Sequence, residues 1–532
     1  KGAFEICFNS NFGIENLTIT CDRDINSQVD SITTEIQERA FYGSGLQCKL
    51  VLHSFISSIG EYAFAYNTNL GNEEIIINAD SISPYAFSNC GVLSQPITIH
   101  SGNVPFHCFD ENEIYDITIG GKIDGSDSCE IETEAFYDII FRGFVKIEGT
   151  AGISYNAFQL CSFAKDITIN GTIGDYAFDN CSCSTRDVTL SIGAVGTNDN
   201  GYNRGVGKYA FLRFGKINQF HLKFTEFSQN EYHIGRYAFF EANITGDVEI
   251  PWYFSEIEDY AFTNCTTISS VSIDNSNIRQ EAFAGCVALR TLQLRSHKTE
   301  NDGGISGMKT IGVRAFYSLG ITSDLIIPST VTEISAEAFA NCGNIRKLVI
   351  ESGSKLQKIG KQAFENCRAM VSEINVTETL LSIEARAFSN CAALRKITFN
   401  ENAKLQKIGD YAFANCSSLN GVLDFPKTCK YIGQYAFHNC NSFNHHLTIK
   451  TICDIGDCAF YGCTKIKRAE LDFDTDGNTD YCRIGDYAFT GIPCYNNHNV
   501  DSTKYGDEEE DDILDIPFYI YCIGQSAFER CT

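Results

Sequence analysis

The sequence has no apolar run that approaches the roughly 18 residues of a membrane-spanning helix, so no membrane insertion is expected within it. It contains no HExxH, GxSxG, Walker A or GxGxxG motif, and its 10 His residues form no pattern with acidic or nucleophilic partners. Basic residues are scarce, because 41 Lys and Arg stand against 67 Asp and Glu and the net charge is −26. A nucleic-acid binder needs a basic surface for the phosphates. These absences predict a protein that is not an enzyme and whose main partner is not nucleic acid.

The sequence nevertheless has ample material for a folded core. Hydrophobic residues make up 43% of it, with 39 Phe and 25 Tyr, which excludes wholesale disorder. The dipeptide Ala-Phe occurs 20 times, mostly 20 to 25 residues apart, and Ile or Val nearly always stands four residues before its Ala. Cys108-Phe109 is a degenerate further copy. A period of this length is the signature of a repeat array.

Short alternating apolar segments lie between these phrases, such as Leu348-Val349-Ile350 and Leu423-Asp424-Phe425, and they predict short β-strands. A unit this small cannot bury its own apolar face, so neighbouring units must stack and share one core. We therefore predict an α/β repeat solenoid, a single domain of about 20 to 21 repeats over residues 1–532. Its strands should pair in one long parallel β-sheet at about 4.8 Å per coil. The Tyr-Ala-Phe phrases should form short helical turns on the other side.

The Phe of each repeat is expected to fill the centre of its coil, where truncation to Ala costs about 3–5 kcal/mol. Examples are Phe364, Phe388, Phe413 and Phe437. The preceding Ala is expected to be small because a larger side chain would push the turn away from the strands.

The phrase Ile-Gly-x-Tyr-Ala-Phe-x-Asn-Cys, nearly intact at 173–181, 408–416 and 432–440, resembles the BspA-like, or Treponema-type, leucine-rich repeat family. The resemblance covers essentially the whole chain. It implies a leucine-rich-repeat right-handed superhelix and a surface or secreted protein associated with adhesion. The family's Pro after the strand survives only at Pro251, Pro328, Pro426 and Pro517.

Cysteine follows the same repeat. Thirteen of the 24 Cys stand three residues after a Phe, and Cys367, Cys391, Cys416 and Cys440 are four of them. Stacked Cα atoms would lie about 4.8 Å apart, but their Cβ atoms point in parallel, so we expect free, buried thiols in the core. Cys453 and Cys482 are the best disulfide candidates among the others.

One segment suggests a metal site. Asp474, Asp476, Asn478 and Asp480, preceded by Asp472, place oxygen ligands at alternate positions, with Gly477 after the third, which is the pattern of a calcium loop. Arg483 stands where a bidentate Glu would be expected. A calcium loop and a plain Asp-Gly-Asn turn therefore both stay open, and no other cofactor is predicted.

Seven Asn-x-Ser/Thr triplets occur, and three belong to the repeat phrase. The other four are candidate glycosylation sites, namely Asn16, Asn170, Asn243 and Asn375. Longer inserts occur at 20–35, 191–205, 295–310 and 490–512, and the first three should emerge at one edge of the solenoid. Such loops either bind ligands or are tolerated surface insertions.

Two functions remain after the exclusions. The resemblance favours a cell-surface or secreted interaction module that binds host, matrix or neighbouring-cell proteins over an extended surface. The abundant unpaired Cys favour instead a cytoplasmic or assembly-associated scaffold. A protein partner is expected in either case, and self-association stays open. The chain begins and ends inside a repeat phrase, so we expect a piece of a longer protein that lacks native end caps.

Overall fold

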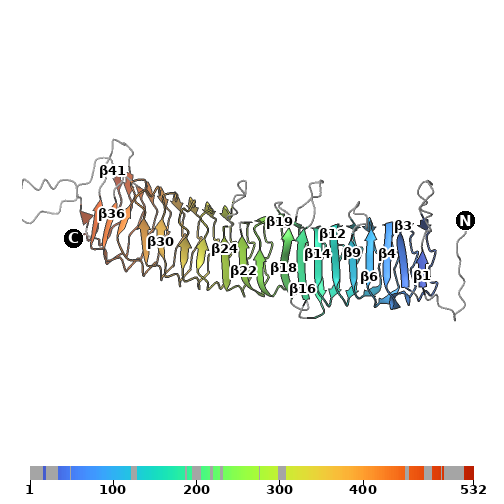
Figure 1. Cartoon of the computed structure of the whole chain (residues 1–532). Coiled ribbons are helices and arrows are strands. Elements are labelled where there is room, and N and C mark those ends of the chain that lie inside the picture. The colour runs from blue at the N-terminus through green and yellow to red at the C-terminus, as the bar shows by residue number, and fades with distance from the viewer. Residues whose placement is uncertain are drawn as a thin grey trace, which may run out of the picture. The chain divides into compact units, whose positions relative to one another are not determined.

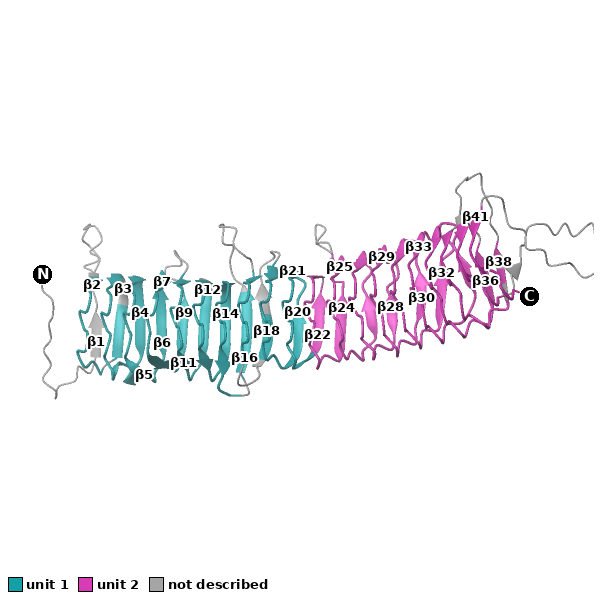
Figure 2. Cartoon of the chain, turned by 180° about the vertical axis from the view of Figure 1, so that it is seen from behind, with its two compact units in different colours: residues 1–269 teal, residues 270–532 magenta. Residues whose placement is uncertain are grey.

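The structure is a computed structural model. It describes residues 16–19, 34–47, 49–120, 129–185, 188–194, 205–215, 220–227, 232–274, 276–296, 307–449, 454–471, 482–492, 494–495 and 520–531. Two compact units divide the chain, and their boundary lies between Ser269 and Ser270 (Figure 2). Each unit is a stack of coils whose strands lie side by side (Figure 1).

Unit 1 contains the elements from β1 to β21. They are β1 (Asn16–Ile19), β2 (Thr34–Ile36), β3 (Lys49–Ile59), η1 (Leu70–Asn72), β4 (Ile75–Ile82), β5 (Gly91–Leu93), β6 (Ile97–Ser101), β7 (Asn103–Val104), β8 (Asn112–Ile114), β9 (Ile117–Gly120), β10 (Glu130–Ile131), β11 (Ile140–Phe141), β12 (Val145–Ile153), β13 (Ser162–Phe163), β14 (Ile167–Ile173), β15 (Ser182–Cys183), β16 (Val188–Ala194), β17 (Gly205–Val206), β18 (Phe220–Phe227), β19 (Tyr232–Ile234), β20 (Gly246–Ile250) and β21 (Phe254–Ile257). The longest strands, from β3 through β4, β6, β9, β12, β14 and β16 to β18, pair in parallel one after another. A second parallel sheet runs in the order β5, β8, β11, β13 and β15.

Strand β22 (Ile268–Asp274) begins at the end of unit 1, and the remaining strands belong to unit 2. They are β23 (Asn277–Ile278), β24 (Thr291–Arg295), β25 (Thr310–Ile311), β26 (Leu325–Ile327), β27 (Glu333–Ile334), β28 (Leu348–Ile350), β29 (Lys358–Ile359), β30 (Glu373–Val376), β31 (Ser382–Ile383), β32 (Lys396–Phe399), β33 (Lys407–Ile408), β34 (Leu423–Phe425), β35 (Tyr431–Ile432), β36 (His446–Ile449), β37 (Asp454–Ile455), β38 (Arg468–Leu471), β39 (Cys482–Ile484), β40 (Cys494–Tyr495) and β41 (Ile520–Ile523).

Unit 2 has two rows of strands. The short strands β25, β27, β29, β31, β33, β35 and β37 form one continuous parallel ladder. The other row is divided into small parallel sheets, among them β26–β28, β30–β32 and β34–β36–β38–β40. The prediction of parallel strands from stacked coils is therefore confirmed, but the strands form several sheets instead of one.

The predicted helical turns are wrong. The described residues contain a single helical element, the three-residue 3-10 helix η1, and the Ala-Phe phrases are turns. Tyr411, just before the Ala, has a φ of 57°, and Asn415, two residues after the Phe, has a φ of 60°. These two left-handed residues lie four positions apart and prevent a continuous helix between them. The N–H of Phe413 donates to the carbonyl of Ala436 in the next coil at 2.8 Å. The N–H groups of Ala412, Ala414 and Cys416 instead donate three residues back within the turn, so alternate N–H groups bond to the next coil.

The Gly that often follows the repeat Ile has a steric reason. A Cβ on Gly409 would lie 2.4 Å from the backbone nitrogen of Ala385 in the preceding coil. A Cβ on Gly433 would lie 2.4 Å from the nitrogen of Asp410. Neighbouring coils approach too closely at this corner for a side chain in either position.

Candidate interaction surface

The Phe column fills the interior of the stack. Phe364, Phe388, Phe413 and Phe437 are fully buried, and their rings stack on one another with centroids 5.2 to 5.3 Å apart. Every ring therefore contacts the coil before it and the coil after it. These residues hold the coils together and offer nothing to a ligand.

The Cys column lies beside it and makes a contact that sequence reasoning missed. The Sγ of Cys391 donates to the carbonyl of Phe364 in the preceding coil at 3.1 Å, and Cys416 donates in the same way to Phe388 at 3.2 Å. Both thiols are free and fully buried. Burial raises the pKa of Cys391 to about 12. At neutral pH the thiol is therefore neither a nucleophile nor a ready metal ligand.

Several predicted site residues lie outside the described residues. These are the calcium-loop residues Asp474, Asp476, Asn478 and Asp480, and Cys453 of the candidate disulfide. Most of the insert residues at 20–35, 191–205, 295–310 and 490–512 lie outside as well. In the part of the chain that the structure describes, no three His, Cys, Asp or Glu side chains come together in a way that could hold a metal ion.

The candidate glycosylation residues differ in their surroundings. Asn375 is exposed on β30, and Asn170 is half-buried on β14. Both polar atoms of the Asn243 side chain are hydrogen-bonded. Nδ2 donates to the carbonyl of Gly215 at 3.3 Å, and Oδ1 accepts from the hydroxyl of Thr267 at 3.0 Å. The side chain of Asn16 is not described. A sugar on Asn243 would break the contact to Gly215, whereas one on Asn375 would extend from an exposed strand.

His107 and Cys108 show how the fold separates adjacent polar residues. Cys108 is fully buried, and burial raises its pKa well above the usual thiol value. His107 instead contacts two carboxylates, with Nδ1 3.1 Å from Asp110 and Nε2 3.5 Å from Glu134. The two side chains lie in different environments because the pair forms part of a turn in which His107 takes the left-handed conformation, with a φ of 51°.

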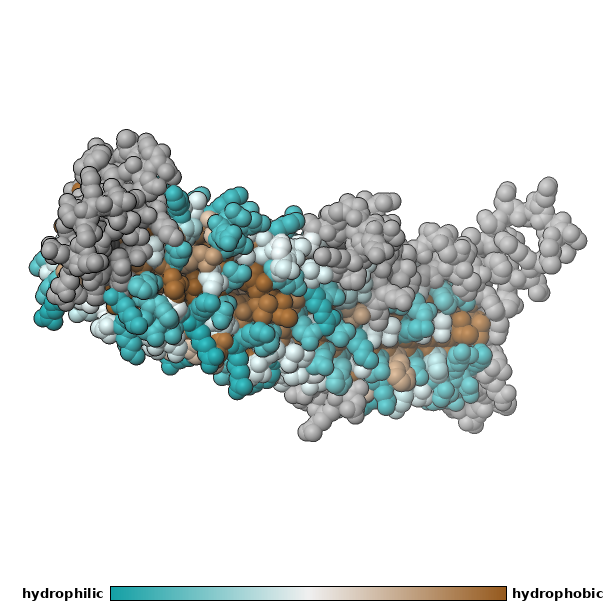
Figure 3. All heavy atoms as spheres, turned by 60° about the vertical axis from the view of Figure 1, so that its left-hand side comes forward, coloured by the Kyte–Doolittle hydropathy of each residue, from teal (hydrophilic) through white to brown (hydrophobic). Residues whose placement is uncertain are grey.

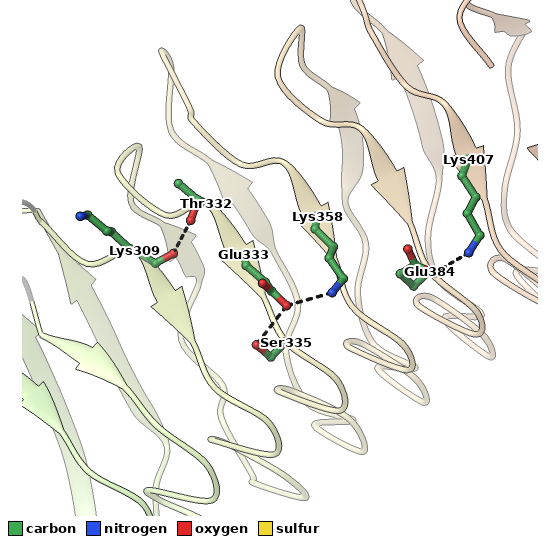
Figure 4. Close-up of polar contacts among 7 residues, drawn as sticks. All are labelled: Lys309, Thr332, Glu333, Ser335, Lys358, Glu384 and Lys407. Carbon is green, nitrogen blue, oxygen red and sulfur yellow. Dashed lines mark hydrogen bonds and ion pairs between the residues drawn. The ribbon is translucent and has the colours of Figure 1, made fainter. Parts of the chain in front are cut away.

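Charges on the short-strand ladder of unit 2 neutralise one another (Figure 4). Lys358 Nζ lies 3.1 Å from Glu333 Oε1, and Lys407 Nζ lies 2.9 Å from Glu384 Oε2. Burial alone would raise the pKa of Glu384, but the hydrogen bonds from Lys407 and Ser382 outweigh it and hold that pKa below its usual value. This row is thus a set of paired charges that link neighbouring coils.

The other strand row of unit 2 is hollowed. One groove of about 730 Å³ lies over β28 and β30, which neighbour each other without ladder pairing, and its lining includes Val349, Glu351, Val371 and Asn375. A second groove of about 830 Å³ lies over β32 and β34, which are also unpaired, and Asn400 lines both grooves. Breaks in the sheet therefore leave adjacent hollows with mixed polar and apolar walls.

Among the described residues, no broad apolar face is visible on the side drawn in Figure 3. Hydrophobic side chains there form separate patches among hydrophilic ones. In unit 2, Ile326, Val371 and Val422 are 43%, 43% and 50% exposed. Apolar patches separated by polar side chains are typical of surfaces that associate reversibly. The average polarity of such surfaces resembles that of the rest of the protein surface.

The coils and columns define a repeat protein of the parallel β-solenoid class. A model of the BspA type leucine-rich repeat region matches it in six copies, over residues 20–115, 129–199, 203–303, 309–444 and 406–532. The chain therefore belongs to the BspA-type leucine-rich repeat family. Members of this family typically carry no catalytic activity.

Solved structures of bacterial leucine-rich repeat proteins are similar to this chain. A leucine rich cell surface protein from Faecalibacterium prausnitzii A2-165 is 20% identical, covering 57% of this chain and 84% of its own, with a TM-score of 0.31. A leucine-rich repeat protein from Bacteroides ovatus is 18% identical, covering 87% and 97%, with a TM-score of 0.37. The pneumococcal vaccine antigen PcpA is 14% identical, covering 71% and 87%, with a TM-score of 0.31.

No curated protein matches the chain. Within its described portion, the chain forms no helix with the length and hydrophobicity to cross a membrane.

Proposed function

We propose that this chain is a non-enzymatic, cell-surface or secreted interaction module that binds host, matrix or neighbouring-cell proteins. The binding surface is the hollowed strand row of unit 2, from β28 to β34. The observation that carries the proposal is the pair of adjacent grooves, which open where the strand row is not paired. Family membership supports it, because BspA-type proteins are surface-associated.

The mechanism is cumulative contact along the stack. Each groove is shallow and open, so a single one holds a partner weakly. A partner that lies across successive coils engages both grooves, and the second contact forms at a high effective concentration once the first has formed. Val371 supplies an apolar anchor 43% exposed, and Asn375 and Glu351 supply polar contacts at the rim.

The test is binding of the labelled chain to immobilised extracellular-matrix proteins, with cytosolic proteins as the comparison panel. Val371→Arg places a bulky charge in the groove, and Val287→Arg is the matched control, because Val287 is 56% exposed and lines neither groove. We expect V371R to weaken binding to a matrix protein by about tenfold or more. V287R should leave it within about twofold. Equal effects of the two variants, or binding to no matrix protein, would contradict the proposal.

A cytoplasmic or assembly-associated scaffold is the second candidate. The buried free thiols favour it, since disulfides accumulate in oxidising compartments. Alkylation of the native protein without reduction, followed by intact-mass measurement, separates the two. Paired Cys or glycan mass on Asn375 supports the extracellular function, whereas free thiols throughout and no glycan favour the scaffold.

A further inference from the structure

Basic residues come in adjacent pairs at the start of alternate strands in unit 2. The pairs are Arg346-Lys347 at β28, Arg395-Lys396 at β32 and His445-His446 at β36, and Lys467 follows in the next coil. They contrast with the net charge of −26 on the whole chain.

Backbone hydrogen bonds place these residues in one column. The carbonyl of Arg346 accepts from the N–H of Val371 at 2.8 Å. In the same intervening coil the carbonyl of Ser372 accepts from the N–H of Arg395 at 3.1 Å, and the carbonyl of Arg395 accepts from Asn420 at 2.8 Å. One coil therefore separates the two Arg residues, which sets a spacing of about 10 Å between cations along the column.

The column continues toward the C-terminal end of the unit. The carbonyl of His445 accepts from the N–H of Lys467 at 3.3 Å, so these residues occupy consecutive coils. Both are exposed, and His446 beside them is exposed too.

Most cations of this column make no ion pair among the described residues, although Glu373 lies opposite Lys396 in the ladder of β30 and β32. Arg346, Arg395 and Lys396 form no ion pair with any residue that the structure describes, whereas Lys358 and Lys407 on the short-strand ladder are both paired (Figure 4). Lys347 lies 3.9 Å from Asp324, but these side chains are 60% and 57% exposed. An ion pair so open to water contributes little.

A hollow of about 430 Å³ lies within the column. Arg395, Lys396, Asn420, Ser442 and His445 line it. Its walls also include Ser418, Gly421 and one acidic residue, Glu373. No Phe, Tyr or Trp among the described residues lines the hollow. It therefore offers cations together with hydroxyl, amide and imidazole groups, which suit an anionic ligand that also carries hydroxyl groups.

We propose that this column, from Arg346 to Lys467, binds a linear sulfated polysaccharide. Sulfate groups lie against the Arg and Lys side chains on alternate coils, and Ser442 and Asn420 hydrogen-bond the sugar hydroxyls between them. The column lies beside the grooves proposed for protein binding and shares Lys347 with one of them and Lys396 and His445 with the other. The inference stands independently of the protein-binding function.

Nucleic acid fits the column less well. Bases stack best on large aromatic rings, and no Phe, Tyr or Trp among the described residues lines the hollow, where His445 and Arg395 are the only stacking groups. For this column the two polyanions differ in the bases and not in their charge, and competition with polyuridylate separates them.

The test compares two double variants of equal net charge on heparin. R395Q/K396Q removes two unpaired cations of the column, and K358Q/K407Q removes two paired cations of the short-strand ladder. We expect the unmodified chain to be retained on immobilised heparin. R395Q/K396Q should bind at least about tenfold more weakly and with a smaller salt dependence, and K358Q/K407Q should bind nearly as the unmodified chain does.

Competition identifies the ligand chemistry. Desulfated heparin and single-stranded polyuridylate are expected to compete far less well than heparin. Melting temperatures of both variants show whether each is folded. The inference would be overturned if immobilised heparin did not retain the unmodified chain, or if the two folded variants lost equal affinity for heparin. It would also be overturned if either probe competed as well as heparin does. V371R tests the protein-binding groove separately, and because it adds a cation in the coil between Arg346 and Arg395, it should bind heparin at least as tightly as the unmodified chain does.

Discussion

At the scale of the residue, the slot three positions after the repeat Phe most often holds a small hydrogen-bond donor, although an apolar residue occupies it at Ile139, Phe214, Ala242, Leu319 and Ile492. Most coils of unit 2 use Cys, but Asn67 and Asn112 occupy the same slot in unit 1. Their Nδ2 atoms donate to the carbonyls of Phe41 and Phe87 at 2.8 and 2.7 Å, as the thiols do elsewhere. The slot therefore serves contact between coils, and its frequent Cys do not indicate redox chemistry.

Cys391→Ala tests this contact. Ala leaves a small cavity and removes one of the two donors to the Phe364 carbonyl, since the N–H of Cys367 still donates to it at 3.2 Å. We expect a loss of about 1–2 kcal/mol in the free energy of unfolding, measured by urea denaturation. Ser417→Ala, at an exposed neighbouring position, is the control and should change it by less than about 0.5 kcal/mol. Equal effects would mean that the thiol contributes nothing.

The buried thiols also predict alkaline instability. Burial raises the pKa of Cys391 from 9.0 to about 12, and that of Cys90 likewise to about 12. A raised thiol pKa contributes stability that is fully present below pH 9 and is lost as pH rises toward 12, because only the unfolded chain ionises readily. The melting temperature should fall between pH 9 and 11, and less steeply in C391A than in the unmodified chain. Identical slopes in both proteins would contradict this assignment.

At the scale of the element, each coil is stabilised by its two neighbours. Phe388 stacks on Phe364 at 5.2 Å and on Phe413 at 5.3 Å, so its loss removes two contacts at once. Stability in stacked repeats is a sum of unit and nearest-neighbour terms.

Phe388→Ala is therefore expected to cost about 3–5 kcal/mol, with the effect confined to nearby coils. Hydrogen exchange followed by mass spectrometry should show lost protection in the peptides around Phe364, Phe388 and Phe413. Protection of the unit 1 strands β9 and β12 should stay unchanged. Uniform loss across both units would show that the stack unfolds as one cooperative body.

At the scale of the whole molecule, the repeat period and the buried strand faces could be predicted from the sequence, because alternation and spacing are local. The helical turns were predicted wrongly, since the pattern does not reveal that Tyr411 and Asn415 take left-handed conformations. The breaks in strand pairing after β28 and β32 could not be predicted from the sequence either, because pairing depends on how closely neighbouring coils approach.

The basic column was missed for a different reason. Its residues lie outside the repeat phrase, and an extra residue in intervening coils, as in Val371-Ser372-Glu373, obscures their alignment. The signal that could have found them is a basic pair four residues after Cys342 and Cys391, and five after Cys440.

The net charge of −26 sets the salt response of the whole molecule. Like charges destabilise a compact chain by mutual repulsion, and salt screens them over about 10 Å at 0.1 M. Raising NaCl from 0.02 to 0.2 M should increase the melting temperature by a few degrees, while it weakens heparin binding. A melting temperature that falls with salt would indicate that ion pairs such as Lys407 with Glu384 outweigh the repulsion.

The most direct test of the proposed surface function is labelling of intact cells that produce the protein. A membrane-impermeant amine reagent should modify exposed lysines such as Lys355 and Lys404 before the cells are lysed. We predict that peptides of this chain carry the label on intact cells, at a level close to that of known surface proteins. Label that appears only after lysis would contradict the surface function and favour the scaffold.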